Sequence, residues 1–291
     1  MSHHKTTPST SIEKRKPTNP IARQVLEVLE RGEYQPPSGT VVSLREQQAA
    51  SEQGTMLYSP GMLQNMSAEG RSGQVLRVEV IDATSQVAAL EATKSGPVVL
   101  LNFASARNPG GGFLGGAKAQ EEDLCRCSGL YPTLLTQPEY YRVHRSDKSL
   151  LYSDHIIYSP NVPFFRVRSS DDFLERPYFA SVITAPAPNA GAMRRNQPQL
   201  EKKLPETFLR RWENILAVAQ AHGHTTLILG AWGCGAFRND PKLVARTAQE
   251  ALLLPRFASS FSRVIFPIPG FNKHSLVNLQ IFQSVFEEQR A

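Results

Sequence analysis

The stretch VVLLNFASARNPGGGFLGGAKAQEED, residues 98–123, decides how this chain folds. Its first six residues form a continuous apolar run with β-branched side chains, which is typical of a strand buried on both faces. Three consecutive glycines and a Gly-Gly pair follow, and two glutamates stand where a helical pattern begins. Such a loop lies at the carboxyl edge of a parallel sheet, where open α/β proteins bind ligands.

Strand and helix patterns alternate on both sides of this stretch. Strand patterns cover residues 40–44, 75–82, 98–103, 155–159, 179–186, 225–229 and 262–269. Helical patterns cover residues 20–32, 45–53, 83–93, 120–134, 205–223, 239–254 and 272–289. This order predicts an α/β fold of three layers, α/β/α, with a mostly parallel, mixed central sheet. We expect one domain over residues 19–291, including an N-terminal helical extension, and a disordered basic tail over residues 1–18.

The composition indicates a globular protein of a reducing compartment. Apolar residues make up 41% of the chain, enough for a core, yet no run approaches the roughly 18 residues of a membrane helix. The N-terminus has no secretory signal, and three cysteines argue against a disulfide scaffold. We therefore expect a cytoplasmic protein, or a nuclear one in a eukaryote, with no membrane partner.

The formal net charge of +6 suits an anionic ligand, but it equally suits solubility alone. No basic run is interleaved with aromatic residues in the way that binds a nucleic-acid backbone. A sequence-specific nucleic-acid partner is therefore not expected.

The glycines fit a nucleotide cofactor poorly. Gly110, Gly112 and Gly115 match G-x-G-x-x-G, but the nearest acids, Glu121 and Glu122, begin the next helix instead of ending the next strand. Acids in a first helical turn offset the helix dipole by about 0.3–1 kcal/mol, which would explain one glutamate. Two glutamates beside a glycine loop favour a site with its own chemistry.

The glycine loop and the glutamates after it resemble the motif of a known family. The pattern GGG, seven residues, QEE is similar to that of poly(ADP-ribose) glycohydrolases, a catalytic branch of the macrodomain fold, and residues 102–134 resemble its microbial form. Further matches are YSPNVPFFR at 158–166, ITAPAPNAG at 183–191 and LGAWGCGAFRNDP at 229–241. The resemblance covers roughly residues 20–285.

The resemblance implies a macrodomain-like fold and a glycosidase that hydrolyses the ribose–ribose O-glycosidic bonds of poly(ADP-ribose). Its substrates would be the polymer and ADP-ribosylated proteins, and its product would be ADP-ribose. Such an enzyme reverses ADP-ribosylation, a modification of the DNA damage response. The resemblance implies neither a cofactor nor a metal ion, and we expect a monomer.

The resemblance also implies roles for the two carboxylates. Glycosidic bonds break through an oxocarbenium-like transition state while an acid protonates the departing oxygen. Glu122 would be that acid and then the base for water, and Glu121 would orient a ribose hydroxyl. We expect a neighbouring negative charge to raise the pKa of the acid.

Other residues are implied to bind substrate. Those around the first loop are Asn102, Asn108, Gly110, Gly111, Gly112 and Gln120. Those of a second glycine loop, implied to hold the diphosphate and a sugar, are Gly233, Cys234, Gly235, Ala236 and Phe237. A tight strand-to-helix turn would also explain that second loop. Phe271 is our candidate for stacking on adenine, with a core phenylalanine as the alternative.

One position departs from the family pattern. Ser105 stands where macrodomains often have an asparagine that touches the distal ribose, so that contact is in doubt.

The remaining motifs have ordinary interpretations. Cys125 and Cys127 stand two residues apart on a helix and do not predict a metal site. The arginine pairs at residues 194–195 and 210–211 are interpreted as solvated faces, with contact to a polyanionic chain as the alternative, and His144 is interpreted as a surface residue. Two other functions stay open: a reader that binds terminal ADP-ribose, and a hydrolase of mono-ADP-ribose.

Overall fold

The computed structural model describes residues 17–66, 75–168, 171–257 and 259–287. Residues 1–16 of the predicted basic tail lie outside these ranges, as do the last residues of the predicted C-terminal helix. None of the helices in the described ranges combines the length and the apolar character that a bilayer crossing requires.

The described residues form one central sheet of seven strands, in the order β3-β6-β7-β5-β8-β9-β4. The strands are β3 (Met56–Tyr58), β4 (Arg77–Ile81), β5 (Val98–Phe103), β6 (Ile156–Phe164), β7 (Tyr178–Ala185), β8 (Thr226–Ile228) and β9 (Arg263–Pro267). β7, β5, β8, β9 and β4 pair in parallel, whereas β6 is antiparallel to both β7 and β3. The expected mostly parallel, mixed sheet is confirmed.

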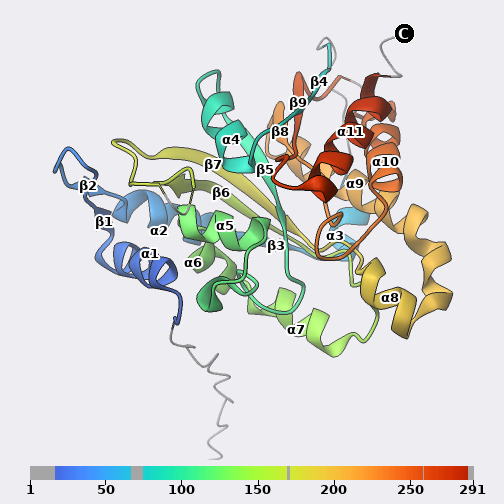
Figure 1. Cartoon of the computed structure of the whole chain (residues 1–291), viewed down its shortest axis with the longest axis horizontal. Coiled ribbons are helices and arrows are strands. Elements are labelled where there is room, and N and C mark those ends of the chain that lie inside the picture. The colour runs from blue at the N-terminus through green and yellow to red at the C-terminus, as the bar shows by residue number, and fades with distance from the viewer. Residues whose placement is uncertain (1–16, 67–74, 169–170, 258, 288–291) are drawn as a thin grey trace, which may run out of the picture.

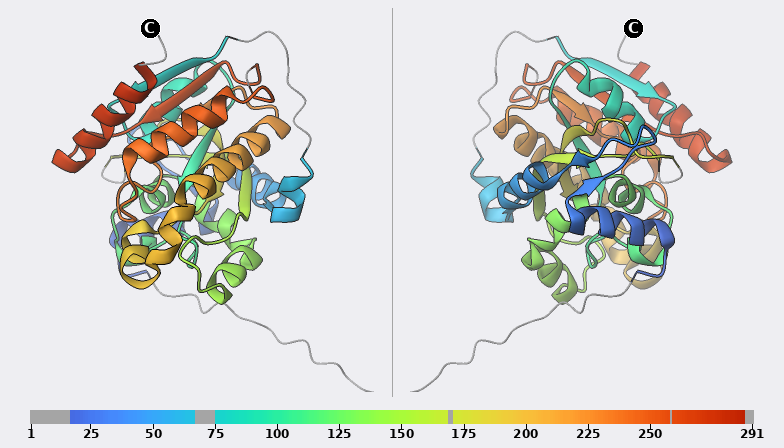
Figure 2. Two further views of the ribbon diagram at one scale, coloured as in Figure 1. Left: turned by 90° about the vertical axis from the view of Figure 1, so that its right-hand side faces the viewer. Right: turned by 90° about the vertical axis from the view of Figure 1, so that its left-hand side faces the viewer.

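Two helical layers cover the faces of this sheet (Figures 1 and 2). One layer contains α9 (Leu204–Ala221), α10 (Pro241–Leu253) and α11 (Lys273–Glu287). The other contains α1 (Pro20–Arg31), α4 (Ser85–Thr93), α5 (Gln120–Cys127) and α6 (Leu130–Leu135). The remaining elements are β1 (Glu33–Tyr34), β2 (Val42–Ser43), α2 (Arg45–Gly54), α3 (Pro60–Gln64), α7 (Pro138–Ser146), α8 (Ala190–Asn196) and 3₁₀ turns at Phe113–Gly115 and Pro198–Lys203.

β5 lies at the centre of the core. Val99 and Leu101 pack into the cluster beneath α9 and α10, whereas Val98 and Leu100 pack into the cluster beneath α4 and α5. Because successive side chains of a strand point to opposite faces, both faces need apolar residues. This requirement explains why residues 98–101 are all apolar and do not alternate with polar residues.

Helix ends follow their local chemistry. The Asn19 side chain accepts a hydrogen bond from the amide of Ala22, and Gly32 ends α1 in the left-handed region at φ +69°. Asp240 caps α10 through the amide of Lys242, with Pro241 as its first residue.

The predicted single helix over residues 120–134 is wrong, because the structure divides it into α5 and α6. Ser128 is extended, at φ −152° and ψ 175°, and forms an isolated bridge with Phe164 of β6. The amide of Gly129 donates to the carbonyl oxygen of Pro163 at 2.9 Å. Pairing with β6, which continues five residues past its predicted end, interrupts the helix. Helical periodicity carries no information about such a partner.

The interpretation of Arg211 as a solvated residue is also wrong. Its side chain is 2% exposed and lies beneath α9. It donates to the carboxylate of Asp154 at 2.9 Å. Its other bonds go to the carbonyl oxygens of Leu151, Tyr152 and Pro186, at 2.6 to 2.9 Å. Arg211 therefore ties α9 both to the segment before β6 and to the residue after β7.

His144, predicted on the surface, is fully buried in α7. Its Nδ1 lies 2.8 Å from the carbonyl oxygen of Tyr140, and its Nε2 lies 2.8 Å from Oγ of Ser153. Burial lowers the pKa of His144 to about 4, so the ring is neutral at neutral pH. Its role is to join α7 to the segment before β6.

Arg211 and Arg210 provide a matched test of burial, since both donate to Asp154 but Arg210 is 45% exposed. We expect Arg211→Gln to lower the free energy of unfolding by about 3–5 kcal/mol, because it removes the buried charge partner of Asp154 and the donor of three carbonyl groups. Arg210→Gln should cost less than about 1 kcal/mol. Urea unfolding of both variants measures the difference in stability. Equal losses of stability would contradict the view that burial makes Arg211 the more important partner of Asp154.

Candidate active site

The first turn of α5 is held against the end of β5 by Gln120. Its Oε1 accepts from the amide of Phe103 at 2.9 Å, and its Nε2 donates to the carbonyl oxygen of Leu101 at 2.7 Å and to Oγ of Ser85 at 3.1 Å. Both polar ends of the side chain are thus engaged within the chain. This geometry makes Gln120 a support for the two glutamates that follow it.

Glu121 points inward and is 2% exposed. Its Oε1 accepts from Nδ2 of Asn102 at 3.2 Å, and its Oε2 accepts from the amide of Ser105 at 2.7 Å. Asn102 is itself fully buried at the end of β5 and also donates to Oγ1 of Thr184 at 3.2 Å. Ser105 therefore acts here through its backbone, on the carboxylate.

Burial raises the pKa of Glu121 to about 8, because removal from water disfavours the charged form. The hydrogen bonds from Ser105 and Asn102 act in the opposite direction, and the charge of Glu122 adds a smaller upward contribution. A neighbouring negative charge was the expected cause of a raised pKa. In the structure burial is the larger cause, and the shift falls on Glu121.

Glu122 points toward the glycine loop and is 8% exposed. Its Oε1 accepts from the amide of Gly112 at 2.8 Å. Its Oε2 has no hydrogen-bond partner among the described residues and is not among the fully buried atoms. One oxygen is therefore anchored, while the other is available to a ligand.

The glycine loop closes over the two carboxylates because it lacks side chains. Gly111 has φ +59°, and a Cβ there would overlap Oε1 of Glu122 and lie 3.1 Å from Oε2 of Glu121. Gly110 has φ +66°, and its Cβ would lie 3.0 Å from the ring of Tyr131. Both the backbone angles and the close approach exclude other residues.

The loop amides serve the chain itself as well as any ligand. The amide of Gly112 donates to Glu122, and that of Gly111 donates to the carbonyl oxygen of Asn108 at 3.0 Å. The resemblance implies that these amides approach a ribose and a phosphate. Asn108 itself is exposed, at the outer side of the loop.

Sequence reasoning missed Arg126, which is 4% exposed although it is charged. Its guanidinium donates to the carbonyl oxygens of Ala117 and Phe113, and so ties the far end of the glycine loop to α5. An arginine in an amphipathic helix normally indicates a solvated face, so no local signal marks this contact.

The second glycine loop follows β8. Gly233 has φ +74°, and a Cβ there would lie 2.6 Å from Nδ2 of Asn239, which donates to the carbonyl oxygens of Gly233 at 2.9 Å and Pro188 at 2.8 Å. Cys234 is buried, and burial raises the pKa of its thiol, so a thiolate nucleophile is disfavoured. The next two residues, Gly235 and Ala236, are exposed, and Phe237 is half-buried.

The two loops lie at the same edge of the sheet, since β7, β5 and β8 are parallel neighbours. A Cβ on Gly230 would lie 2.9 Å from the ring of Phe103, where the first loop begins. The amide of Gly191, after β7, donates to the carbonyl oxygen of Phe237 at 2.8 Å. The structure thus brings together three of the segments that carried the family resemblance.

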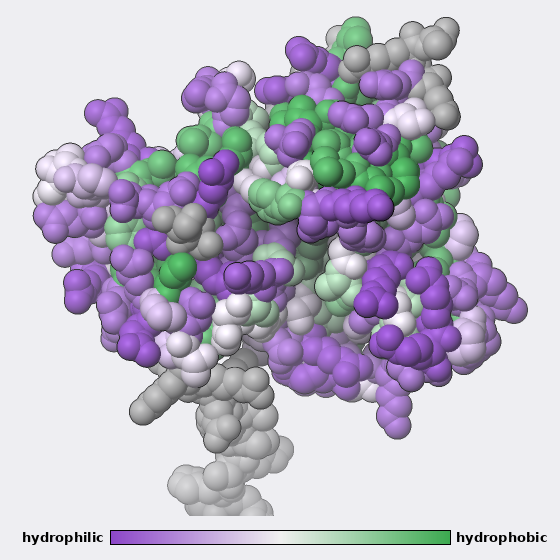
Figure 3. Space-filling model, in the orientation of Figure 1, coloured by the Kyte–Doolittle hydropathy of each residue, from purple (hydrophilic) through white to green (hydrophobic). Residues whose placement is uncertain are grey.

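Phe271 lies between β9 and α11 and is 77% exposed, so the alternative of a core phenylalanine is wrong. Nε2 of His274 lies 3.1 Å from the carbonyl oxygen of Cys234, which joins this segment to the second loop. Leu276 and Val277 of α11 are each 42% exposed, and Figure 3 shows apolar surface over the region of α11.

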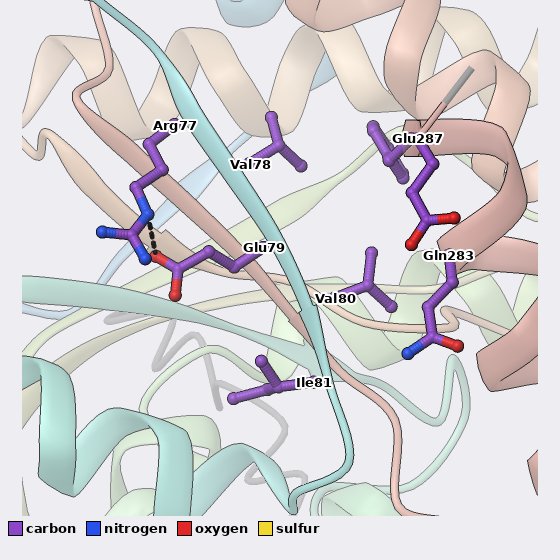
Figure 4. A pocket seen from close by; sticks show the side chains of 8 residues that line it. Arg77, Val78, Glu79, Val80, Ile81, Gln283 and Glu287 are labelled. Carbon is purple, nitrogen blue, oxygen red and sulfur yellow. Dashed lines mark ion pairs between the residues drawn. The ribbon is translucent and has the colours of Figure 1, made fainter. Parts of the chain in front are cut away.

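A separate hollow of about 250 Å³ lies between β4 and α11 (Figure 4). Its lining residues are Arg77, Val78, Glu79, Val80, Ile81, Gln283, Phe286 and Glu287. It contains none of the candidate site residues. Among the described residues, no three His, Cys, Asp or Glu side chains cluster so as to hold a metal ion, and Cys125 and Cys127 are buried free thiols.

Comparison with known proteins identifies the family. The model of the microbial-type PARG catalytic domain matches residues 22–167. Poly(ADP-ribose) glycohydrolase from Thermomonospora curvata, bound to the inhibitor ADP-HPD, is 42% identical, with a TM-score of 0.82 over 91% of this chain and 97% of that chain. The Deinococcus radiodurans enzyme in complex with ADP-ribose is 40% identical, with a TM-score of 0.78 over 84% of this chain and 98% of that chain. A search of curated proteins found no match. The chain belongs to the family of microbial-type poly(ADP-ribose) glycohydrolases.

Proposed function

We propose that Glu122 is the general acid and base of this glycohydrolase and that Glu121 orients the substrate. The chain is a poly(ADP-ribose) glycohydrolase, a glycosidase acting on ribose–ribose bonds. The observation that supports the assignment is the geometry of Glu122, whose Oε1 is anchored by Gly112 while its Oε2 is free. A carboxyl with one fixed and one available oxygen suits proton transfer to a bound substrate.

In the proposed reaction, Oε2 of Glu122 donates its proton to the oxygen that bridges two riboses. The bond to the anomeric carbon breaks, and positive charge develops on the sugar. The ionised Glu122 then takes a proton from the attacking water. The amide of Gly112 assists, because it holds Oε1 and so keeps Oε2 directed away from the loop backbone toward the substrate.

In this proposal, Glu121 orients the substrate as a neutral side chain. With a pKa of about 8, it is mostly protonated at neutral pH. A neutral side chain places no negative charge beside an anionic polymer, and it can still exchange a hydrogen bond with a ribose hydroxyl. Asn102 and the amide of Ser105 hold it in one orientation.

The other substrate contacts are proposed around this centre. We assign the diphosphate to the exposed turn at Gly235 and Ala236, a sugar to Phe237, and adenine to the exposed ring of Phe271. Residues 19–291 would act as one catalytic domain, with ADP-ribose as the released product. Exposed backbone amides in a glycine turn and an exposed aromatic ring suit a phosphate and a base, respectively.

Glu122→Gln should lower the rate of ADP-ribose release from the polymer about 10²- to 10⁴-fold, because an amide cannot donate and recover the proton. Binding of ADP-ribose, measured by calorimetry, should change by less than about fivefold, since the shape of the side chain is kept. Asp123→Asn is the matched control on the next residue of α5, and it should retain activity. Equal rates for wild type and Glu122→Gln would remove Glu122 from the mechanism.

Gly111→Ala should place a methyl group against both carboxylates at a backbone angle that alanine avoids. We expect kcat/KM on the polymer to fall about 10- to 100-fold, because small displacements of catalytic groups have effects of this size. Gly115→Ala in the same loop meets no atom within 4 Å and should behave like wild type. If the two variants had the same activity, close packing at Gly111 would not matter for catalysis.

The raised pKa of Glu121 predicts a pH-dependent stability. The folded protein keeps this proton up to about pH 8, whereas the unfolded chain releases it near pH 4.5, so unfolding releases a proton between these values. The free energy of unfolding should therefore fall with rising pH by about 2–4 kcal/mol more in wild type than in Glu121→Gln. Urea unfolding of both proteins from pH 4.5 to 8 tests this. If their free energies of unfolding changed with pH to the same extent, the prediction would be contradicted.

A further inference from the structure

Two arginines lie on adjoining segments at the outer side of the first glycine loop. Arg107 lies within the loop, five residues before Gly112, and Arg145 lies on α7. Nη1 of Arg145 donates to the carbonyl oxygen of Arg107 at 2.8 Å, across 38 residues of sequence. Figure 1 shows the loop after β5 beside α7. Both residues are exposed, so their charges face solvent.

Neither of these arginines forms an ion pair with a residue in the described ranges. Arg142, three residues earlier on α7, instead pairs with Glu139 of the same helix. Two exposed arginines on adjoining segments, neither of them ion-paired in the described ranges, create a positive surface potential. Guanidinium groups bind phosphate oxygens through two parallel hydrogen bonds, so this pair is suited to a phosphate or diphosphate.

The arginine pair is connected directly to the candidate catalytic residues. Oγ of Ser105 accepts from the amides of Arg107 at 3.3 Å and Asn108 at 3.2 Å, which shapes the turn that carries Arg107. The amide of the same serine donates to Glu121. The arginine pair, from α7 and the first loop, therefore lies beside the turn that holds Glu121. The proposed diphosphate turn is a separate feature, in the loop after β8.

We propose that Arg107 and Arg145 bind the pyrophosphate of the polymer unit that remains after cleavage. This inference rests on the proposed function, in which the two glycine loops hold the terminal unit. The oxygen protonated by Glu122 then belongs to the adenosine ribose of the next unit, and the 5′ carbon of that ribose carries the next pyrophosphate. The pair thus binds the polymer on the leaving-group side of the bond.

The test compares two substrates that differ in this pyrophosphate. One is poly(ADP-ribose), and the other is ADP-ribose with a 4-nitrophenoxy group on its anomeric carbon, which releases 4-nitrophenol on hydrolysis. The double variant Arg107→Gln/Arg145→Gln should lose about tenfold in kcat/KM on the polymer at low salt. It should stay within about twofold on the aryl substrate, which also verifies that the variant is folded. The slope of log kcat/KM against log salt should become shallower by about 1 to 2, one for each lost phosphate contact.

Two further variants make the charge argument specific. Arg107→Lys/Arg145→Lys keeps both charges and should recover most of the salt dependence. Arg142→Gln removes a charge from the same helix that is already paired, and it should leave both substrates unchanged. The inference is overturned if the glutamine double variant acts like wild type on the polymer, if both substrates lose rate equally, or if Arg142→Gln has the same effect.

Failure of this inference can be told apart from failure of the proposed function. Polymer affinity is measured in the Glu122→Gln background, with and without the two glutamine substitutions, so that no turnover is needed. The arginine site predicts a loss of about tenfold in this affinity, and unchanged affinity overturns the inference. A wild-type protein that releases no ADP-ribose from polymer would instead refute the proposed function.

Discussion

The hydrogen bond from the amide of Gly112 to Oε1 of Glu122, 2.8 Å long, is the contact on which the rest of the site depends. It can form only because Gly111 carries no Cβ and adopts φ +59°, which lets bare backbone lie against two carboxylates. The loop keeps this position because Arg126 holds its far end and Gln120 holds the start of α5 to β5. The loop backbone therefore lies fixed against a side chain that has one oxygen without a hydrogen-bond partner among the described residues.

Two adjacent glutamates acquire different properties from this arrangement. Successive residues of a helix point about 100° apart, so one carboxyl of α5 enters the core and the other meets the loop. Burial keeps Glu121 protonated near neutral pH, with a pKa of about 8, while its two oxygens accept from Asn102 and Ser105. The same local sequence thus supplies a neutral positioning group and, in our proposal, a group that exchanges a proton.

The edge of the sheet that carries these groups is assembled from distant parts of the chain. Arg211 joins α9 to the residue after β7, and Asn239 closes the second glycine loop onto Pro188. These are buried contacts between polar groups and backbone carbonyls, which are costly to leave unsatisfied. Exposed side chains at this edge, such as Phe271, make no such buried contacts and are accessible to a ligand.

The sequence alone determined the features that depend on neighbours in the chain. The apolar run of β5 and the pattern of three glycines before two glutamates were readable, because side-chain periodicity and the freedom of glycine to adopt φ > 0 are local properties. Only the tertiary structure decided the break between α5 and α6 and the burial of Arg211. Ser128 leaves the helix to pair with β6, and Arg211 is neutralised by Asp154, 57 residues away. The protonation of Glu121 likewise follows from burial beneath a loop and a sheet, which no pattern within its own helix records.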